Sequence, residues 1–291
     1  MSSERRILAI VNPAAGGGSA LRRFEKIRGQ LDCLGSVEVA LTAAPGDAER
    51  LAAAADAQVV VAGGGDGTVH EIVNGLLGAA SPARLMALPL GTGCDFSANM
   101  EAIAADGSQR DLELAIDVGR ARFADGSARY FVNAANVGAS TASTRRVSKY
   151  KLLRALGRAA YVAGGLPEVL SRPTEEYGLA LGETEARSVR LLSLSLCNGP
   201  RFGGGLCLAP ESRLDDATLH MAEVEPRGVL GLGRTLLAGF GRGAEPRPGV
   251  NVTRCGEILV QGTGDVELDG ELPGCLPASF TVLPAALTVL V

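Results

Sequence analysis

The chain of 291 residues contains no tryptophan, and aromatic residues make up only 4% of it. Lysine is scarce as well, because only three of the 28 basic residues are lysines, and the formal net charge is −4 at pH 7. General nucleic-acid binding depends on an excess of positive charge that neutralises phosphates. We therefore expect no nucleic-acid partner.

Histidines and paired cysteines are also rare. The only histidines are His70 and His220, and none of the six cysteines forms a Cys-x-x-Cys motif. A structural zinc site takes four such ligands at close spacing, so the sequence argues against one. Reduced thiols are typical of the cytoplasm, which is the location we expect. We also expect His70 to be exposed, His220 to be structural, and Cys94, which has no evident basic partner, not to be a nucleophile.

Long apolar runs are missing too. No run approaches the roughly 20 residues that cross a bilayer as a helix, so we expect any membrane contact to be peripheral, at the inner membrane face. The first apolar run, Ile7–Val11, is too short for the core of a signal peptide and predicts a β-strand.

Glycine is abundant, at 39 positions, and the most informative stretch of the chain is a glycine loop. The β-branched run Val59–Val61 predicts a strand, and Gly63–Gly67 predicts a loop with Asp66 inside it. Thr68 and Glu71 have the spacing of a capping box, and apolar residues follow them at helical spacing. Strand, loop and capped helix form a typical anion site, although a plain turn that needs the freedom of glycine is the alternative.

A phosphate is the anion that we expect in this loop. The loop is not a Walker A motif, because no lysine follows the glycines, and it is not Gly-x-Gly-x-x-Gly either. Something else must neutralise a polyphosphate, and Mg²⁺ held near Asp66 is the natural candidate.

Residues 5–100 alternate between strand and helix signals. Such repeats predict an α/β domain with a parallel, Rossmann-like sheet. Right-handed crossovers would place the loops that follow its strands along the carboxyl edge of the sheet. We assign this N-terminal domain to residues 1–108.

The rest of the chain contains many short strand-like pieces separated by Gly, Pro and Asp turns. This pattern predicts an all-β sandwich domain over residues 109–291. Its expected strands include single strands over residues 189–197, 279–282 and 287–291. Two helical insertions are expected in this domain, around residues 145–166 and 226–240.

The first insertion has a basic face, which consists of Lys151, Arg154 and Arg158. This face is either a solvated surface or a surface that touches anionic lipid.

Four acidic clusters stand beside glycines: Asp66, Asp95, Asp215-Asp216 and Asp269-Gly270-Glu271. Asp66 and Asp95 end neighbouring strand loops and could face one ligand. Asp269-Gly270-Glu271 is either a hairpin turn or a source of carboxylates for a bound nucleotide. Phosphoryl transfer requires bound phosphates, charge neutralised by Mg²⁺ and a base near the acceptor hydroxyl, and these residues meet those needs.

Ordered motifs extend through nearly the whole chain. They are Asn12-Pro13, Gly64–Thr68, Asn74-Gly75, Gly91–Phe96, Asp117–Gly119, Phe131–Asn133, Asn198-Gly199, Gly203–Gly205, Ala209-Pro210, Asp215-Asp216 and Asp269–Glu271. In this order they resemble the diacylglycerol kinase catalytic-domain family, which includes sphingosine and ceramide kinases and soluble bacterial lipid kinases. The Gly-Gly-Asp-Gly-Thr motif alone also occurs in NAD kinases and phosphofructokinases, whereas the ordered set is highly specific.

The resemblance implies a nucleotide-binding α/β domain of the NAD-kinase and phosphofructokinase type, a β-sandwich domain for the lipid acceptor, and an active site between them. It implies that ATP is lined by Asn12, Thr42, Gly63, Gly64, Gly65, Asp66, Gly67, Thr68, Val69, Thr92 and Asp95.

The resemblance also implies catalytic and metal-binding roles. Asp66 and Asp95 would belong to the Mg²⁺–nucleotide network, and the general base would be Asp269 or Glu271, which the resemblance does not separate. A structural Mg²⁺ would be bound by the Asp216 side chain and by the carbonyl groups of Arg213 and Thr218.

Two positions depart from the family pattern. Cys94 stands where the family usually has Asn, which removes an amide donor and acceptor, and Ala217 stands where it usually has Gly.

The implied activity is that of an ATP- and Mg²⁺-dependent lipid kinase, which phosphorylates a hydroxyl of a diacylglycerol, sphingoid or phosphatidylglycerol-type lipid. One alternative is a kinase for a soluble acceptor such as NAD⁺. Another is a nucleotide- and lipid-binding protein with weakened catalysis, which Cys94 suggests. The expected partners are the lipid substrate and an anionic membrane surface, and the sequence leaves the oligomeric state open, a homodimer included.

Overall fold

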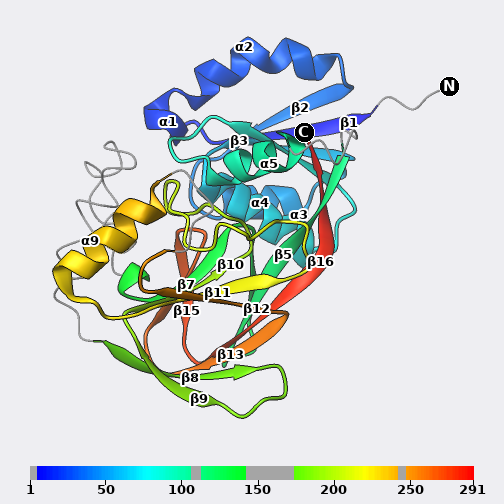
Figure 1. Ribbon diagram of the computed structural model, residues 1–291. Helices are drawn as coiled ribbons and strands as arrows, with labels where there is room; N and C mark the ends of the chain where they lie inside the picture. Colours follow the sequence, from blue (N-terminus) through cyan, green and yellow to red (C-terminus); the bar gives the residue numbers. More distant parts are fainter. Residues whose placement is uncertain (1–4, 106–112, 142–173, 242–246) are drawn as a thin grey trace. The chain divides into compact units, whose positions relative to one another are not determined.

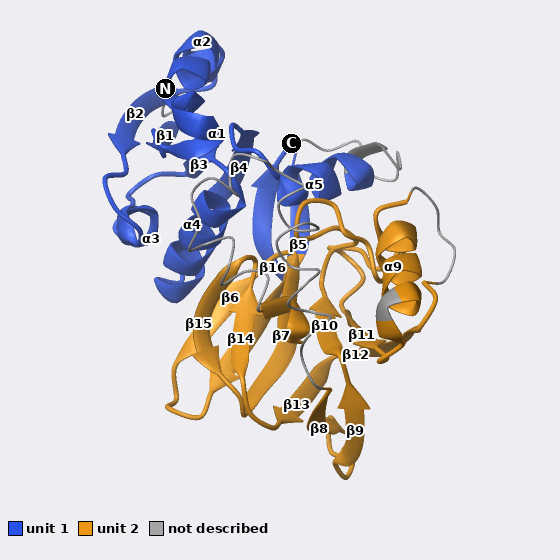
Figure 2. Cartoon of the chain, turned by 90° about the vertical axis from the view of Figure 1, so that its left-hand side faces the viewer, with its two compact units in different colours: residues 1–116, 285–291 blue, residues 117–284 orange. Residues whose placement is uncertain are grey.

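The computed structural model describes residues 5–105, 113–141, 174–241 and 247–291 (Figure 1). The chain forms two compact units (Figure 2). Unit 1 consists of residues 1–116 and 285–291, and unit 2 consists of residues 117–284. The helix expected around residues 145–166, with its basic face, lies outside the described residues.

Four parallel strands form the sheet of unit 1, in the order β2-β1-β3-β4. They are β1 (Arg6–Val11), β2 (Ser36–Leu41), β3 (Val59–Gly64) and β4 (Arg84–Pro89). At the β4 edge, Val289 and Leu290 of β16 (Ala278–Leu290) pair in parallel with Leu85 and Met86. The β-branched run in β3 is buried along its whole length, as a strand covered on both faces must be.

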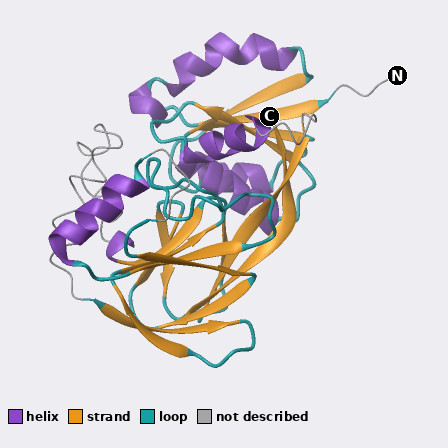
Figure 3. Cartoon of the chain, in the orientation of Figure 1, coloured by secondary structure: helices purple, strands orange, loops and turns teal. Residues whose placement is uncertain are grey.

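The helices of unit 1 alternate with its strands, which confirms the predicted α/β class (Figure 3). They are α1 (Ala15–Gly18), α2 (Ala20–Asp32), α3 (Asp47–Ala53), α4 (Asp66–Gly78) and α5 (Asp95–Ala105). Phe24 and Leu31 of α2 are buried in one apolar cluster with Val59 and Val61 of β3. The apolar faces that the sequence predicts therefore position the loops at the strand ends.

The start of α4 differs from the prediction. The helix begins at Asp66, earlier than the capping box requires, and its N-cap residue is Gly65, which has no side chain that could cap the helix. The Glu71 carboxylate instead accepts hydrogen bonds of 3.0 Å from the backbone N–H groups of Gly46 and Ala48, at the start of α3. The predicted capping box is therefore wrong, because Glu71 satisfies free amides of a neighbouring helix.

Unit 2 contains an antiparallel six-stranded sheet in the order β12-β11-β10-β7-β14-β15. Its strands are β7 (Ala134–Gly138), β10 (Ser193–Cys197), β11 (Leu219–Val224), β12 (Val250–Cys255), β14 (Asp265–Leu268) and β15 (Glu271–Cys275). The other strands of the unit are β6 (Ala128–Phe131), β8 (Glu175–Leu181), β9 (Arg187–Leu191), β13 (Glu257–Gln261), and most of β5 (Glu113–Phe123) and of β16.

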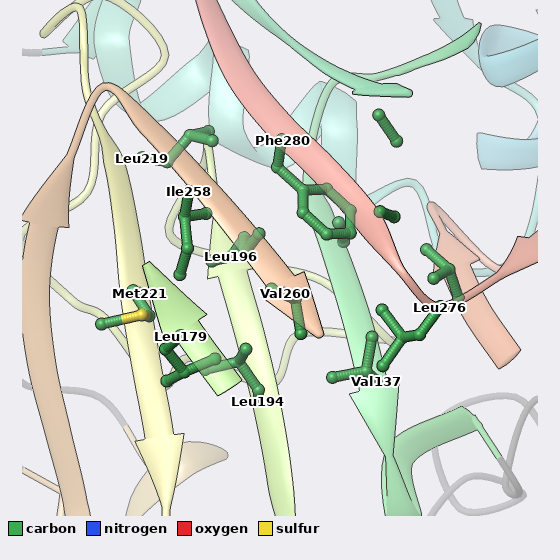
Figure 4. Packing of buried hydrophobic residues seen from close by; sticks show 14 of the residues in the cluster. Val137, Leu179, Leu194, Leu196, Leu219, Met221, Ile258, Val260, Leu276 and Phe280 are labelled. Carbon is green, nitrogen blue, oxygen red and sulfur yellow. The ribbon is translucent and has the colours of Figure 1, made fainter. Parts of the chain in front are cut away.

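Apolar side chains from both sets of strands form the core of unit 2, which confirms the predicted sandwich (Figure 4). Buried members of this cluster include Val137, Leu194, Leu196, Met221, Leu179, Ile258, Val260 and Phe280. The helix α9 (Gly228–Gly239) confirms the second predicted insertion.

Two predicted strand assignments are wrong. Residues 189–197 belong to two strands, β9 and β10, which lie in different sheets and are separated at Leu192. Residues 279–282 and 287–291 were expected to be separate strands, but β16 is continuous through Pro284 and Ala285. Pairing with β4 keeps the last residues extended, and such a long-range partner leaves no local sequence signal.

Candidate functional site

The loops that follow the parallel strands of unit 1 meet at the carboxyl edge of the sheet. The chain continues from β1 to β2 on one side of β1, and β3 then lies on the other side of β1. Open α/β sheets bind ligands at such a switch in strand order, which here lies between β1 and β3. The backbone N–H of Asn12 donates to the Gly63 carbonyl (3.0 Å), and that of Thr42 donates to the Val11 carbonyl (3.0 Å). Asn12, Thr42 and Gly63, which the sequence predicts as ATP-lining residues, are therefore brought together.

The Asn12 side chain connects two of these loops. Its Nδ2 donates to the Thr68 hydroxyl (3.4 Å), and its Oδ1 accepts a hydrogen bond from the backbone N–H of Ala14 (3.0 Å). The same side chain thus fixes the loop after β1 and contacts the first turn of α4. Backbone amides of that first turn are the groups that bind phosphates at helix N-termini.

Glycines allow the loops after β3 and β4 to approach one another. A Cβ at Gly91 would lie 2.4 Å from the Gly65 Cα, and a Cβ at Gly64 would lie 2.2 Å from the Thr68 hydroxyl oxygen. Both distances exclude a side chain, so the glycines are needed for packing as well as for loop conformation. This close approach argues against a plain turn, which would need glycine only for its backbone angles.

Asp66 and Asp95 occupy the first residues of α4 and α5. The Asp66 carboxylate accepts a hydrogen bond from the backbone N–H of Phe96 (3.2 Å), and its other oxygen lies against Gly93. Asp95 is buried. The two carboxylates therefore share one loop region, as the sequence predicts, and their oxygens are the ligand type that Mg²⁺ prefers.

Cys94 directly precedes Asp95 and has a left-handed φ of 54°. Few residues other than glycine and asparagine adopt this conformation, so the backbone at this position suits Asn better than Cys. Burial, and then the negative charge of Asp66, raise the pKa of the Cys94 thiol. The thiol is therefore protonated near neutral pH, which agrees with the expectation that it is no nucleophile.

Arg23 is a site residue that the sequence reasoning missed. Its guanidinium donates hydrogen bonds to the carbonyl groups of Pro89 (2.9 Å) and Leu90 (3.2 Å), at the end of β4. Its positive charge also lowers the pKa of the Cys94 thiol, against the larger opposing effects of burial and Asp66, so Arg23 lies near the Gly91–Asp95 loop. The sequence shows only an arginine-rich helix, and the missing loop lysine is the one signal that could have directed attention to it.

The other residues of the predicted ATP site are distributed along the same edge. Thr92 is exposed, Gly67 is half-buried, and Val69 is buried behind the first turn of α4. His70 is also buried, and its ring contacts the Asn74 side chain (3.4 Å), so the expected exposure of His70 is wrong. The cause is that α4 is buried on nearly every side, with almost all residues from Thr68 to Leu76 buried, so the helix has no solvent-exposed face at His70.

In unit 2, the Asp269 carboxylate is bound to the backbone. It accepts hydrogen bonds from the N–H groups of Val132 (2.7 Å), Asn133 (2.8 Å) and Ala134 (3.1 Å). Asp269 itself has a left-handed φ of 49°. This side chain fixes the start of β7, and both of its oxygens already have donors.

A row of buried polar side chains supports the same turn. The Ser195 hydroxyl donates to Asn136 Oδ1 (2.6 Å), and Asn136 Nδ2 donates to the Glu267 carboxylate (3.0 Å). The other Glu267 oxygen accepts a hydrogen bond from the backbone N–H of Gly270 (2.7 Å). These contacts cross β10, β7 and β14 and hold the Asp269–Glu271 turn from a second side.

Glu271 differs from Asp269 because no backbone donor in the described part of the chain holds its carboxylate. Its side chain is exposed, and among the described residues no hydrogen bond or ion pair to its carboxylate is found. The turn is therefore fixed by Asp269 and Glu267, while Glu271 presents a carboxylate that is open to solvent.

At the predicted structural metal site, the Asp216 carboxylate already has hydrogen-bond partners within the protein. Asp216 accepts hydrogen bonds from the backbone N–H (3.1 Å) and hydroxyl (3.0 Å) of Thr218, and its other oxygen lies 2.8 Å from Nε2 of buried His220. Arg213 pairs with Asp215. The described part of the chain holds no group of three or more His, Cys, Asp and Glu side chains suited to a metal. The Mg²⁺ at Arg213, Asp216 and Thr218 stays a prediction, whereas His220 is structural, as expected.

The nearby Asn198 side chain contains an orphaned acceptor. Its Nδ2 donates to the carbonyl groups of Asp117 and Val132 (both 2.9 Å), which fixes the orientation of the amide. Its Oδ1 is buried and has no partner among the described residues. The Asp117 carboxylate accepts a hydrogen bond from the N–H of Ala217 (2.6 Å), so these residues support the Asp216 loop.

Comparison with known proteins covers both units. Residues 6–122 match the family model described as the diacylglycerol kinase catalytic domain. Residues 133–291 match the model of the YegS C-terminal NAD kinase beta sandwich-like domain. A protein of Pseudomonas fluorescens named "Probable lipid kinase YegS-like" is 33% identical across 99% of this chain and 95% of its own length. A protein of the same name from Pseudomonas aeruginosa is 31% identical across 98% and 93%.

A solved structure shares the fold. The crystal structure of a diacylglycerol kinase from Bacillus anthracis aligns with a TM-score of 0.72 over 100% of this chain and 98% of that chain. The sequence identity of 20% makes this a likeness of fold alone.

Proposed function

The chain belongs to the family of lipid kinases that contain the diacylglycerol kinase catalytic domain, and on that premise we propose that it transfers the γ-phosphoryl group of ATP to a lipid hydroxyl with the help of Mg²⁺. The observation that carries this proposal is the convergence of three glycine-containing loops at the β1/β3 edge of unit 1. They bring backbone amides and two carboxylates to one place, which is what a metal-bound polyphosphate requires.

In this proposal the loops of unit 1 hold the nucleotide. Asn12 and Thr68 fix the phosphate-side loops, and Arg23 supplies positive charge where a lysine is lacking. Mg²⁺, when bound, would neutralise the polyphosphate and would be held by Asp66 and Asp95. Asp66 is suited to this task, because the Phe96 N–H orients its carboxylate.

We assign the general base to Glu271 rather than Asp269. A base needs a lone pair that can take the proton of the acceptor hydroxyl. Three backbone donors occupy the oxygens of Asp269, whereas the carboxylate of Glu271 is exposed. Asp269 then positions the turn from which Glu271 acts.

The acceptor is proposed to be a diacylglycerol, a sphingoid base or a phosphatidylglycerol-type lipid. Each offers a primary hydroxyl and long apolar chains, so the enzyme would work at a lipid surface. No helix among the described residues is long and apolar enough to cross a membrane. Access to the acceptor by peripheral contact with an anionic membrane is therefore part of the proposal.

A direct test uses the purified protein with γ-labelled ATP, Mg²⁺ and mixed micelles that contain a panel of acceptor lipids. Labelled lipid is the expected product. The Asp66→Ala variant should lose it, since Mg²⁺ would lose one of the two carboxylates proposed to hold it. The Asp56→Ala variant removes an exposed carboxylate that pairs with Arg6 at the surface, and it should retain activity.

Other outcomes would contradict the proposal. Label that appears in NAD⁺ or a sugar without lipid would indicate a kinase for a soluble acceptor. Calorimetry that detects no binding of ATP with Mg²⁺ would remove the premise of nucleotide binding altogether.

A further inference from the structure

Helix α9 of unit 2 has one side anchored in the protein. Leu232 and Thr235 are buried, and the Thr235 hydroxyl donates to the Pro248 carbonyl. Gly239 lies so close to Leu206 that a Cβ would be 2.6 Å from the leucine Cδ1. The helix is therefore held by its inner side, and its outer side is not required for this packing.

The outer side carries two leucines that are almost fully exposed. Leu230 is 84% exposed and Leu237 is 78% exposed, whereas the other exposed large hydrophobic residues of the described chain reach at most 51%. Residues seven apart lie on the same face of a helix, so the two leucines form one apolar ridge. Exposed leucines cost free energy in water, and a ridge of them indicates a surface that binds something apolar.

The charge on this face has a single sign. Arg234 lies between the two leucines in the helix, is exposed, and makes no ion pair within the described part of the chain. Residues 226–241 include no Asp or Glu. Arg227, at the N-terminus of the helix, pairs with Glu225 (3.0 Å) and leaves Arg234 as the uncompensated charge.

We propose that the outer face of α9, which consists of Leu230, Arg234 and Leu237, is a docking surface for an anionic lipid bilayer. The leucines enter the boundary between headgroups and acyl chains, and the guanidinium of Arg234 contacts lipid phosphates. The inference rests on the proposed function in one respect, since a lipid acceptor is presented by a membrane.

Charge favours a bilayer over a second copy of this chain. A two-fold interface centred on this ridge would place the Arg234 side chains of both copies in the same apolar contact. Burial of two like charges without acidic partners is unfavourable. An anionic bilayer offers both an apolar layer and opposite charge.

The test is co-sedimentation of the full chain with phosphatidylcholine vesicles, with and without phosphatidylglycerol. The unmodified protein should bind the vesicles that contain phosphatidylglycerol, and added salt should weaken binding. The double variant Leu230→Gln/Leu237→Gln should bind at least tenfold more weakly, and Arg234→Gln should lose most of the preference for anionic vesicles. Leu259→Gln, which removes a 37% exposed leucine from β13, is the matched control and should bind normally.

Activity on a short-chain, monomeric acceptor separates this inference from the proposed function. The double variant should phosphorylate that acceptor at the normal rate and lose activity only on vesicles. If neither the unmodified protein nor any variant shows kinase activity, but the double variant still loses vesicle binding as expected, the proposed function would be overturned and the docking surface supported. Unchanged vesicle binding, equal loss on the monomeric acceptor, or a dimer that the double variant dissociates would overturn the docking surface.

Discussion

The Asp269 carboxylate lies 2.8 Å from the backbone nitrogen of Asn133, a residue 136 positions earlier in the chain. Further hydrogen bonds to Val132 and Ala134 make this carboxylate the acceptor for three consecutive backbone amides. Loss of such an acceptor leaves backbone amides unpaired, which lowers the free energy of unfolding. Mutation of Asp269 should therefore affect mainly stability, whereas mutation of Glu271 should affect mainly activity.

Asp269→Asn should lower stability, and Glu271→Gln should lower activity. Asn tolerates the left-handed backbone of residue 269, but its NH₂ group would face a backbone N–H, so a loss of about 1–3 kcal/mol is expected. Glu271→Gln leaves the fold intact and removes the proposed base, which should lower kcat by about 10²–10⁴-fold. Urea unfolding and initial rates measure the two effects. If Asp269→Asn is as stable as the unmodified protein and loses more kcat than Glu271→Gln does, then Asp269 is the general base and the assignment to Glu271 is wrong.

The buried contact between Asn136 and Glu267 should be strongly coupled. Asn136→Leu leaves the Ser195 hydroxyl and the Glu267 carboxylate without this partner, and a destabilisation of about 2–3 kcal/mol is expected. Glu267→Leu alone and the double variant complete a cycle, because leucine accepts no hydrogen bond from Asn136. Their coupling free energy should exceed about 0.5 kcal/mol, since the two side chains are in direct contact. Additive effects in urea unfolding would show that the contact does not stabilise the turn.

The fold could be predicted well where its signals are local. The β-branched run of β3 and the glycine loop before Asp66 are adjacent in sequence, and they predicted a strand followed by an anion-binding loop. Repetition of such units then predicted that Asn12, Asp66 and Asp95 would meet at one sheet edge. In a parallel sheet with right-handed crossovers, all loops that follow the strands lie at the same edge, so this prediction depends only on the strand assignments.

The residues that the sequence did not reveal act on distant partners. Glu71 has the spacing of a local capping box, yet it binds amides 23 and 25 positions earlier in the chain. Arg23 contacts carbonyl groups more than 60 positions later. Asp269 and Glu271 look equivalent in sequence, and only the backbone of Val132–Ala134 distinguishes them. Tertiary contacts of this kind have no periodicity that a sequence pattern could detect.

Glu71 should be important for the stability of unit 1. Glu71→Ala removes the acceptor for two amides at the start of α3, and a loss of about 1–2 kcal/mol is expected, as for an N-cap residue. Glu25→Ala changes an exposed glutamate in α2 and should stay within about 0.5 kcal/mol of the unmodified protein. Thermal unfolding of both variants measures the difference. Equal melting temperatures would show that the Glu71 contacts contribute nothing.

Ala217→Gly should stabilise the protein. Ala217 has a φ of 57°, where a side chain costs about 1–2 kcal/mol, and glycine entropy offsets only part of this gain. A net gain of up to about 1 kcal/mol is expected, seen as a rise of a few degrees in Tm. Ala53→Gly is the control, because this exposed residue ends α3 with ordinary helical geometry and the change should lower stability. A lower Tm for Ala217→Gly would mean that the Cβ makes contacts that outweigh the strain.

The pH dependence of Cys94 alkylation should reveal the negative charge of the nearby Asp66 carboxylate. Only the thiolate reacts with iodoacetamide, and burial together with the Asp66 carboxylate raises the pKa of this thiol, so its reaction should begin at higher pH than that of an ordinary thiol. Asp66→Asn removes the negative charge and should move the pH profile to lower pH. Mass spectrometry of the peptide that contains Cys94 separates it from exposed Cys33 and Cys275. A profile that does not move in Asp66→Asn would show that the carboxylate does not face the loop in solution, and the proposed Mg²⁺–nucleotide site would lose its central ligand.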